Sequence, residues 1–110
     1  MARYLVHQSD RNAAPIIEAM RKAGACVEPL GRPVDVLLTV AGLVAIAEIK
    51  TAKGKTRSRA QAAFLKRWRG PCPILRTVDD GIALVNELEW MAGVLGRVGW
   101  PTERKDWESA

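Results

Sequence analysis

Residues 34–50 read VDVLLTVAGLVAIAEIK, two apolar runs separated by Ala41-Gly42. Glycine supplies the backbone freedom that a tight reversal needs, so this stretch predicts a β-hairpin. If the turn is centred on Ala41-Gly42, counting outward along both strands places Asp35 opposite Glu48. Residues that face each other in this way have Cβ atoms about 5 Å apart, and two like charges there repel. The hairpin therefore predicts a costly pair of carboxylates inside an apolar stretch.

Three consecutive residues at the end of the second run extend this cluster. Because side chains alternate between the two faces of a strand, Lys50 shares the face of Glu48, and Ile49 points to the other face. Two carboxylates and the main-chain carbonyl of Ile49 are enough oxygen ligands for Mg²⁺, which keeps several waters. Lys50 could then orient a bound water or stabilise charge on a phosphoryl group. The alternative is an ion cluster that faces solvent across the two strands.

The segments around the hairpin predict three helices and two further strands. We expect helices at 11–23, from Ser58 to about residue 69, and from a cap at Asp79 or Asp80 to about Leu95, with strands at 26–30 and 74–78. The first helix buries Ile16, Ile17 and Met20, and the second buries Phe64, Leu65 and Trp68. The element order is thus α-β-β-β-α-β-α, and a crossover helix between two strands implies that they are parallel. The predicted class is α/β or α+β, a small mixed sheet flanked by helices.

Length and composition limit the function classes. The chain has 110 residues, which suit one domain with one core. No apolar run approaches the roughly 20 residues of a membrane span, and no signal-peptide pattern is present, so we expect a cytoplasmic protein without a membrane partner. Cys26 and Cys72 have no metal-ligand spacing, which favours two reduced thiols.

Positive charge is concentrated in one part of the chain. The net charge is +5, and between Ile49 and Val78 there are nine basic residues and no acidic one: Lys50, Lys53, Lys55, Arg57, Arg59, Lys66, Arg67, Arg69 and Arg76. Such a patch is expected where a protein binds a phosphate backbone, although a solvated basic surface is the alternative. The residues that we expect to contact DNA are Lys53, Lys55, Arg57, Arg59, Lys66, Arg67 and Arg69.

Two further residues have both a structural and a functional interpretation. Gln61 completes a capping box with Ser58, or it projects from the start of its helix into the site and positions water or phosphate. Glu18 forms an ordinary surface pair with Lys22, four residues on, or it supplies a third carboxylate to the metal.

The motif Asp35 … Glu48-Ile49-Lys50 resembles that of the PD-(D/E)XK nuclease superfamily. Over residues 10–85 the segments DRNAAPIIEAMRKAGACVEPL, GRPVDVLL, AEIK, RSRAQAAFLKRWRG and PILRTVDDGIALV look like the VRR-NUC-like group of small phage and prophage nucleases. The resemblance implies a restriction-endonuclease-like αβββαβ core in a nuclease domain at 1–99, followed by a polar tail at 100–110. It makes Asp35 and Glu48 metal ligands, Lys50 the catalytic lysine and Gln61 the motif glutamine.

The chain departs from the family pattern in two places. The usual Pro-Asp pair is interrupted as Pro33-Val34-Asp35, and Ala14 and Pro15 offer no ligand where relatives often carry Gln or Glu. Glu18, one turn later, could substitute, and Asn12 is also near.

The expected function is therefore a Mg²⁺-dependent DNA endonuclease, with Mn²⁺ as an alternative ion, encoded by a phage or mobile element. Single-domain members of the resembled superfamily often act as homodimers. Alternatives are a Holliday-junction or flap-type resolvase, or a catalytically silent DNA-binding module on the same fold. An RNA-binding domain would need stacking aromatic residues that this chain does not arrange.

Overall fold

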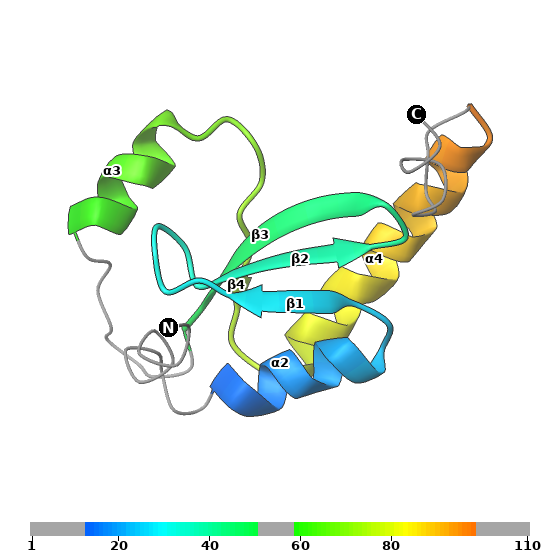
Figure 1. Cartoon of the computed structure of the whole chain (residues 1–110), viewed down its shortest axis with the longest axis horizontal. Helices are drawn as coiled ribbons and strands as arrows, with labels where there is room; N and C mark the ends of the chain where they lie inside the picture. Colours follow the sequence, from blue (N-terminus) through cyan, green and yellow to red (C-terminus); the bar gives the residue numbers. More distant parts are fainter. Residues whose placement is uncertain (1–12, 51–58, 99–110) are drawn as a thin grey trace.

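The computed structural model describes residues 13–50 and 59–98 (Figure 1). Predictions for Lys53, Lys55 and Arg57, for a cap at Ser58 and for the two ends of the chain fall outside these residues. The elements follow the predicted order: α2 (Ala13–Lys22), β1 (Cys26–Pro29), β2 (Val36–Val40), β3 (Leu43–Ile49), α3 (Arg59–Arg67), β4 (Ile74–Leu75) and α4 (Val78–Gly96).

The four strands form one mixed sheet in the order β1-β2-β3-β4. β1 with β2 and β2 with β3 are antiparallel, whereas β3 and β4 are parallel, as the crossover through α3 requires. The class is therefore α+β with a mixed sheet, and the prediction of the fold class is confirmed.

The hairpin has the predicted turn and register. Ala41 and Gly42 have φ of 49° and 89°, the two positive values that a two-residue type I′ turn needs. Val40 pairs with Leu43, and the ladder continues without a slip to Val36 opposite Ala47. One further step along this register brings Asp35 to Glu48.

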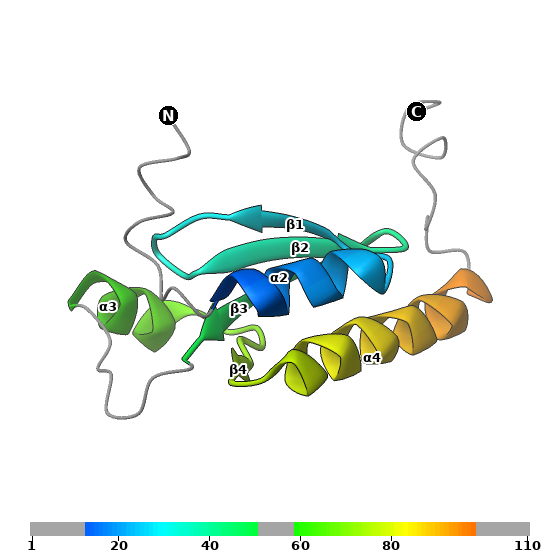
Figure 2. The same ribbon diagram turned by 90° about the horizontal axis from the view of Figure 1, so that it is seen from below.

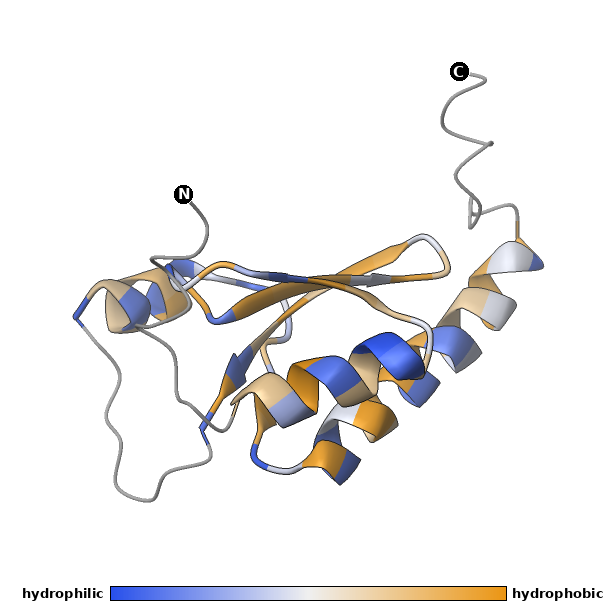
Figure 3. Cartoon of the chain, turned by 60° about the horizontal axis from the view of Figure 1, so that its bottom comes forward, coloured by the Kyte–Doolittle hydropathy of each residue, from blue (hydrophilic) through white to orange (hydrophobic). Residues whose placement is uncertain are grey.

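Helices α2 and α4 pack together on one face of the sheet (Figure 2). The hydropathy colouring places most of the apolar residues in the strands and in parts of these two helices (Figure 3). Ile16 and Met20 are buried as predicted, and Ile17 is half-buried. The centre of the core consists of Ile16, Met20, Val27, Val36, Leu38, Val40, Ala47, Ile49, Leu75 and Val85.

The prediction for the buried face of α3 is wrong in part. Trp68 is 41% exposed, Phe64 and Leu65 are only half-buried, and Gln61 is the one buried residue of the helix. The rings of Phe64 and Trp68 stack on each other, with centroids 5.4 Å apart. The physical reason is position: α3 lies beyond the end of the sheet where β3 ends, away from the layer formed by α2 and α4 (Figure 1).

The start of α4 also differs from the prediction. Its N-cap is Thr77 rather than Asp79 or Asp80, because a capping box forms there. The Thr77 hydroxyl accepts a hydrogen bond from Asp80 N at 3.1 Å, and the Asp80 carboxylate accepts from Thr77 N at 3.2 Å and from Arg76 N at 2.7 Å. These bonds use the main-chain groups that would have lengthened the strand, so β4 contains only Ile74 and Leu75 instead of reaching residue 78.

Two glycines of α4 should respond oppositely to alanine. A Cβ on Gly81 would lie 2.9 Å from Met20 Cγ and 3.1 Å from Ile16 Cγ2, two residues that are 0% and 2% exposed, whereas a Cβ on Gly93 meets no described atom within 4 Å. Gly81→Ala should therefore lower the free energy of unfolding by about 1–3 kcal/mol through overpacking. Gly93→Ala should raise it by about 0.5–1 kcal/mol through helix propensity. Urea unfolding of both variants checks this, and equal stabilities would show that α2 and α4 do not pack as closely as described.

Candidate metal centre

The last residues of β3 are held by different partners on their two sides. Towards β4, Glu48 N donates to Pro73 O at 3.0 Å and Lys50 N donates to Leu75 O at 3.1 Å. Between them, Ile49 N points to the β2 side of the strand. The backbone of the Glu48-Ile49-Lys50 motif is thus fixed by hydrogen bonds that alternate in direction, as they must in the middle of a sheet.

Asp35 completes the sheet with its side chain. Its main-chain oxygen faces the β1 side, where it accepts hydrogen bonds from Leu30 N at 2.8 Å and Gly31 N at 3.4 Å, and the ladder between β2 and β3 ends at Val36. In place of the missing carbonyl, Asp35 Oδ2 accepts the hydrogen bond of Ile49 N at 2.7 Å. A residue in an antiparallel strand directs its N–H and its C=O to the same side, so the Asp35 carboxylate lies on the same side of β3 as the Ile49 carbonyl.

Glu48 is 0% exposed, although it is a carboxylate. The predicted alternation holds: Ile49 is 4% exposed and belongs to the core cluster, and Lys50 is half-buried. Enclosing a carboxylate is costly unless it is hydrogen-bonded, paired or bound to a metal. This burial contradicts the alternative in which Glu48 belongs to an ion cluster that faces solvent.

The predicted third carboxylate does not join this pair. Glu18 is exposed on α2, and among residues 13–50 and 59–98 no group of three or more His, Cys, Asp or Glu residues could hold a metal ion. Gln61 is 7% exposed and is the buried residue of α3. The oxygen donors that the strand register and the bond between Asp35 and Ile49 N bring to this end of β3 are the carboxylates of Asp35 and Glu48 and the carbonyl of Ile49. This set fits a hard cation that keeps part of its water shell.

The described members of the predicted DNA-contact set lie on the surface. Arg59, Lys66, Arg67 and Arg69 are all exposed, on α3 or directly after it. Arg67 is partly fixed, because its Nη1 donates to Ala63 O at 3.2 Å and its guanidinium lies 5.6 Å from the centroid of the Phe64 ring. A basic surface of this kind suits a phosphate backbone.

One basic residue at the centre was not in the predicted set of DNA contacts. Arg76 Nη1 donates a hydrogen bond to the main-chain oxygen of Lys50 at 3.2 Å. The sequence carried a signal for it, because Arg76 lies in the strand predicted at 74–78, which was expected to run parallel to the one that ends in Lys50.

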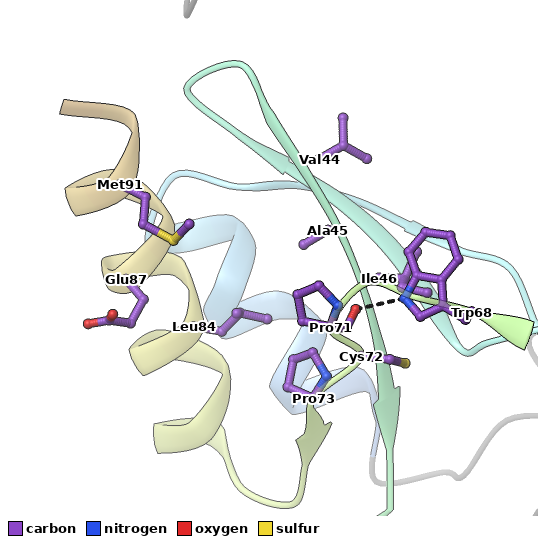
Figure 4. A pocket seen from close by; sticks show the side chains of 10 residues that line it. All are labelled: Val44, Ala45, Ile46, Trp68, Pro71, Cys72, Pro73, Leu84, Glu87 and Met91. Carbon is purple, nitrogen blue, oxygen red and sulfur yellow. Dashed lines mark hydrogen bonds between the residues drawn. The ribbon is translucent and has the colours of Figure 1, made fainter. Parts of the chain in front are cut away.

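An apolar groove lies beside β3 (Figure 4). Its volume is about 520 Å³, and Glu87 is its one charged lining residue. The Trp68 indole closes one side, with Nε1 donating to Pro71 O at 3.1 Å. The lining contains none of the predicted site residues; it consists of Val44, Ala45, Ile46, Trp68, Pro71, Cys72, Pro73, Leu84, Glu87 and Met91.

Cys26 and Cys72 form no disulfide, in agreement with the prediction of reduced thiols. Among the described residues, no helix is both long and apolar enough to cross a membrane. The protein-family models, the curated proteins and the solved structures with which the chain was compared give no significant match.

Proposed function

We propose that this protein is a Mg²⁺-dependent DNA endonuclease of the PD-(D/E)XK superfamily, in its VRR-NUC-like group. The observation that carries the proposal is the complete burial of Glu48 at the end of β3, where the register places it opposite Asp35, one step beyond the pair of Val36 and Ala47. Two carboxylates that face each other across paired strands repel, and a divalent cation held between them offsets that repulsion. This donor set and the sequence motif both favour a site that binds a divalent cation.

The residues of the centre have distinct roles in this proposal. Asp35, Glu48 and the Ile49 carbonyl would hold Mg²⁺ or Mn²⁺. The ion would supply a polarised phosphoryl oxygen and a more acidic water. Lys50, on the same face as Glu48, stabilises the charge that develops on the phosphate or orients the attacking water. Gln61 helps to position the same water or phosphate from α3.

The substrate in this proposal is DNA. The support is the run of 28 residues from Lys50 to Thr77 that contains nine basic and no acidic residues, four of them exposed on or just after α3. By resemblance to the superfamily, we further propose a homodimer that acts in the cytoplasm and is encoded by a phage or mobile element.

Cleavage by the purified protein should require both a divalent cation and Lys50. Linear, nicked, flapped and four-way-junction DNA are each incubated with Mg²⁺, with Mn²⁺ or with excess chelator. Lys50→Ala should lower the cleavage rate about 100-fold or more, because it removes the cation that stabilises developing negative charge.

Lys22→Ala is the matched control, since it removes the same charge from an exposed position on α2 that is outside the predicted set of DNA contacts. It should change the cleavage rate only a few-fold, and circular dichroism confirms that both variants are folded. Full activity in chelator, or in the Lys50 variant, contradicts the proposal. Preference for junctions or flaps identifies a resolvase, and binding without cleavage of any substrate identifies a silent DNA-binding module.

A further inference from the structure

The main chain of Lys50 is hydrogen-bonded to Leu75 in β4 and to Arg76, the residue that follows β4. Lys50 N donates to Leu75 O at 3.1 Å, and Lys50 O accepts from Arg76 Nη1 at 3.2 Å. Both hydrogen-bonding groups of the lysine backbone are therefore occupied on this side. Arg76, 26 residues further along the chain, fixes the point from which the lysine side chain extends.

Hydrogen bonds also fix the backbone of Arg76. Its N–H donates to Asp80 Oδ2 at 2.7 Å, and the same oxygen accepts from Thr77 N at 3.2 Å. These bonds belong to the capping box that starts α4. Arg76 is thus held at its backbone by the start of α4 and at its guanidinium by the end of β3, although the residue is exposed.

The strand register places Arg76 on the side of the sheet where the proposed chemistry occurs. Ile74 is opposite Glu48 and Leu75 is opposite Ile49, so one further step brings Arg76 to Lys50. Successive side chains alternate between faces, and paired residues of parallel strands share a face, so Arg76 belongs to the face of Glu48 and Lys50.

A guanidinium has five N–H donors in a planar fork. The described hydrogen bond to Lys50 uses one nitrogen, and the fork geometry suits the oxygens of a phosphate. Within the described residues, no carboxylate is hydrogen-bonded to this guanidinium, since Asp80 contacts the main-chain N–H instead.

We propose that Arg76 binds a DNA phosphate beside the scissile one, and that the same guanidinium positions Lys50. This inference rests on the proposed nuclease function and adds a residue to its phosphate-binding set. An arginine that is already held by a carbonyl needs little further ordering when a phosphate arrives, which favours binding.

The test compares Arg76→Gln and Arg76→Lys with Arg97→Gln as the matched control. Arg97 is an exposed arginine at the C-cap of α4, the opposite end of a 19-residue helix. Arg76→Gln should lower kcat/KM for DNA cleavage about 100-fold. Arg76→Lys keeps the charge but loses the fork, and it should recover only part of that loss. The kcat/KM of Arg97→Gln should stay within about twofold of the wild-type value, because salt screens the effect of a surface charge that is far from the site.

A second readout separates phosphate binding from a purely structural role. Binding of the same DNA without a divalent cation is measured at several salt concentrations. Arg76→Gln should reduce the slope of log K against log salt by about one, the value for one lost phosphate contact, and Arg97→Gln should leave the slope unchanged.

Three results are informative in different ways. If Arg76→Gln matches Arg97→Gln in both kcat/KM and slope, the inference is overturned while the nuclease function stands. The same conclusion follows if Arg76→Gln lowers only the unfolding temperature, with the activity of the folded fraction and the slope unchanged. If the wild type cleaves none of the DNA substrates, the nuclease function fails instead, and the slope alone decides whether Arg76 binds phosphate.

Discussion

Glu48→Gln should reduce DNA cleavage by about 1000-fold or more, yet leave the metal-free protein as stable as the wild type or more stable. Glutamine keeps the shape of the side chain but removes a charged oxygen ligand, so the centre loses affinity for the cation and its effect on the phosphate. The same change removes a charge that is fully buried in the fold and repels Asp35.

Thermal unfolding with and without Mg²⁺ measures the second half of this prediction. A ligand that binds only the folded state stabilises it by about 2.7 kcal/mol when its concentration is 100 times Kd, so Mg²⁺ should raise the melting temperature of the wild type. It should raise that of the Glu48 variant much less. A metal-free variant that is less stable than the wild type, with an unchanged response to Mg²⁺, would rule out the metal centre.

Glu18→Gln is the control for this experiment. It makes the same chemical change at an exposed position of α2. Among the described residues, Glu18 does not form a metal-binding group with two other His, Cys, Asp or Glu residues. We expect neither its cleavage rate nor its response to Mg²⁺ to differ from the wild type. A clear loss of both would instead make Glu18 the third carboxylate of the centre.

Two substitutions of Asp35 should both slow cleavage strongly, but the two variants should differ in their free energy of unfolding. Asn retains an oxygen that can accept the hydrogen bond of Ile49 N, which Asp35 Oδ2 accepts at 2.7 Å, whereas Ala leaves that N–H without its acceptor in a residue that is 4% exposed. Asp35→Ala should therefore lower the free energy of unfolding by about 1–3 kcal/mol relative to Asp35→Asn. Both should cleave DNA at least about 100-fold more slowly, because each has lost an anionic ligand.

Urea unfolding and hydrogen exchange check the difference between these two variants. The amide of Ile49 should exchange faster in Asp35→Ala than in Asp35→Asn, because its hydrogen bond protects it. Equal stability and equal exchange would show that the bond between Asp35 and Ile49 does not support the hairpin. Wild-type cleavage by Asp35→Asn would exclude Asp35 as a ligand.

The sequence predicted those features that depend on neighbours in the chain. The hairpin register follows from a two-residue turn and a period of two, and for that reason Val36 opposite Ala47 could be counted from Ala41-Gly42. The burial of Ile16 and Met20 followed in the same way from the helical period.

Features that depend on distant packing were not predictable. The apolar face of α3 showed that the helix is amphipathic but not what it packs against, and Trp68 proved to be exposed. Thr77 and Asp80 are both good capping residues, and the choice between them depends on where β4 ends. The bond from Arg76 to Lys50 joins residues that come together only when β3 and β4 pair.

The hydrogen bond between Asp35 and Ile49 has a consequence for the thermodynamics of ion capture. A carboxylate side chain that is free to rotate must give up rotamer entropy when it becomes a ligand. Asp35 is already confined to one orientation by the main chain of β3, so this loss occurs when the hairpin folds and not when the cation arrives. The hairpin thus acts as a preorganised chelator, whose affinity should depend on the rigidity of the strands as much as on the charge of the ligands.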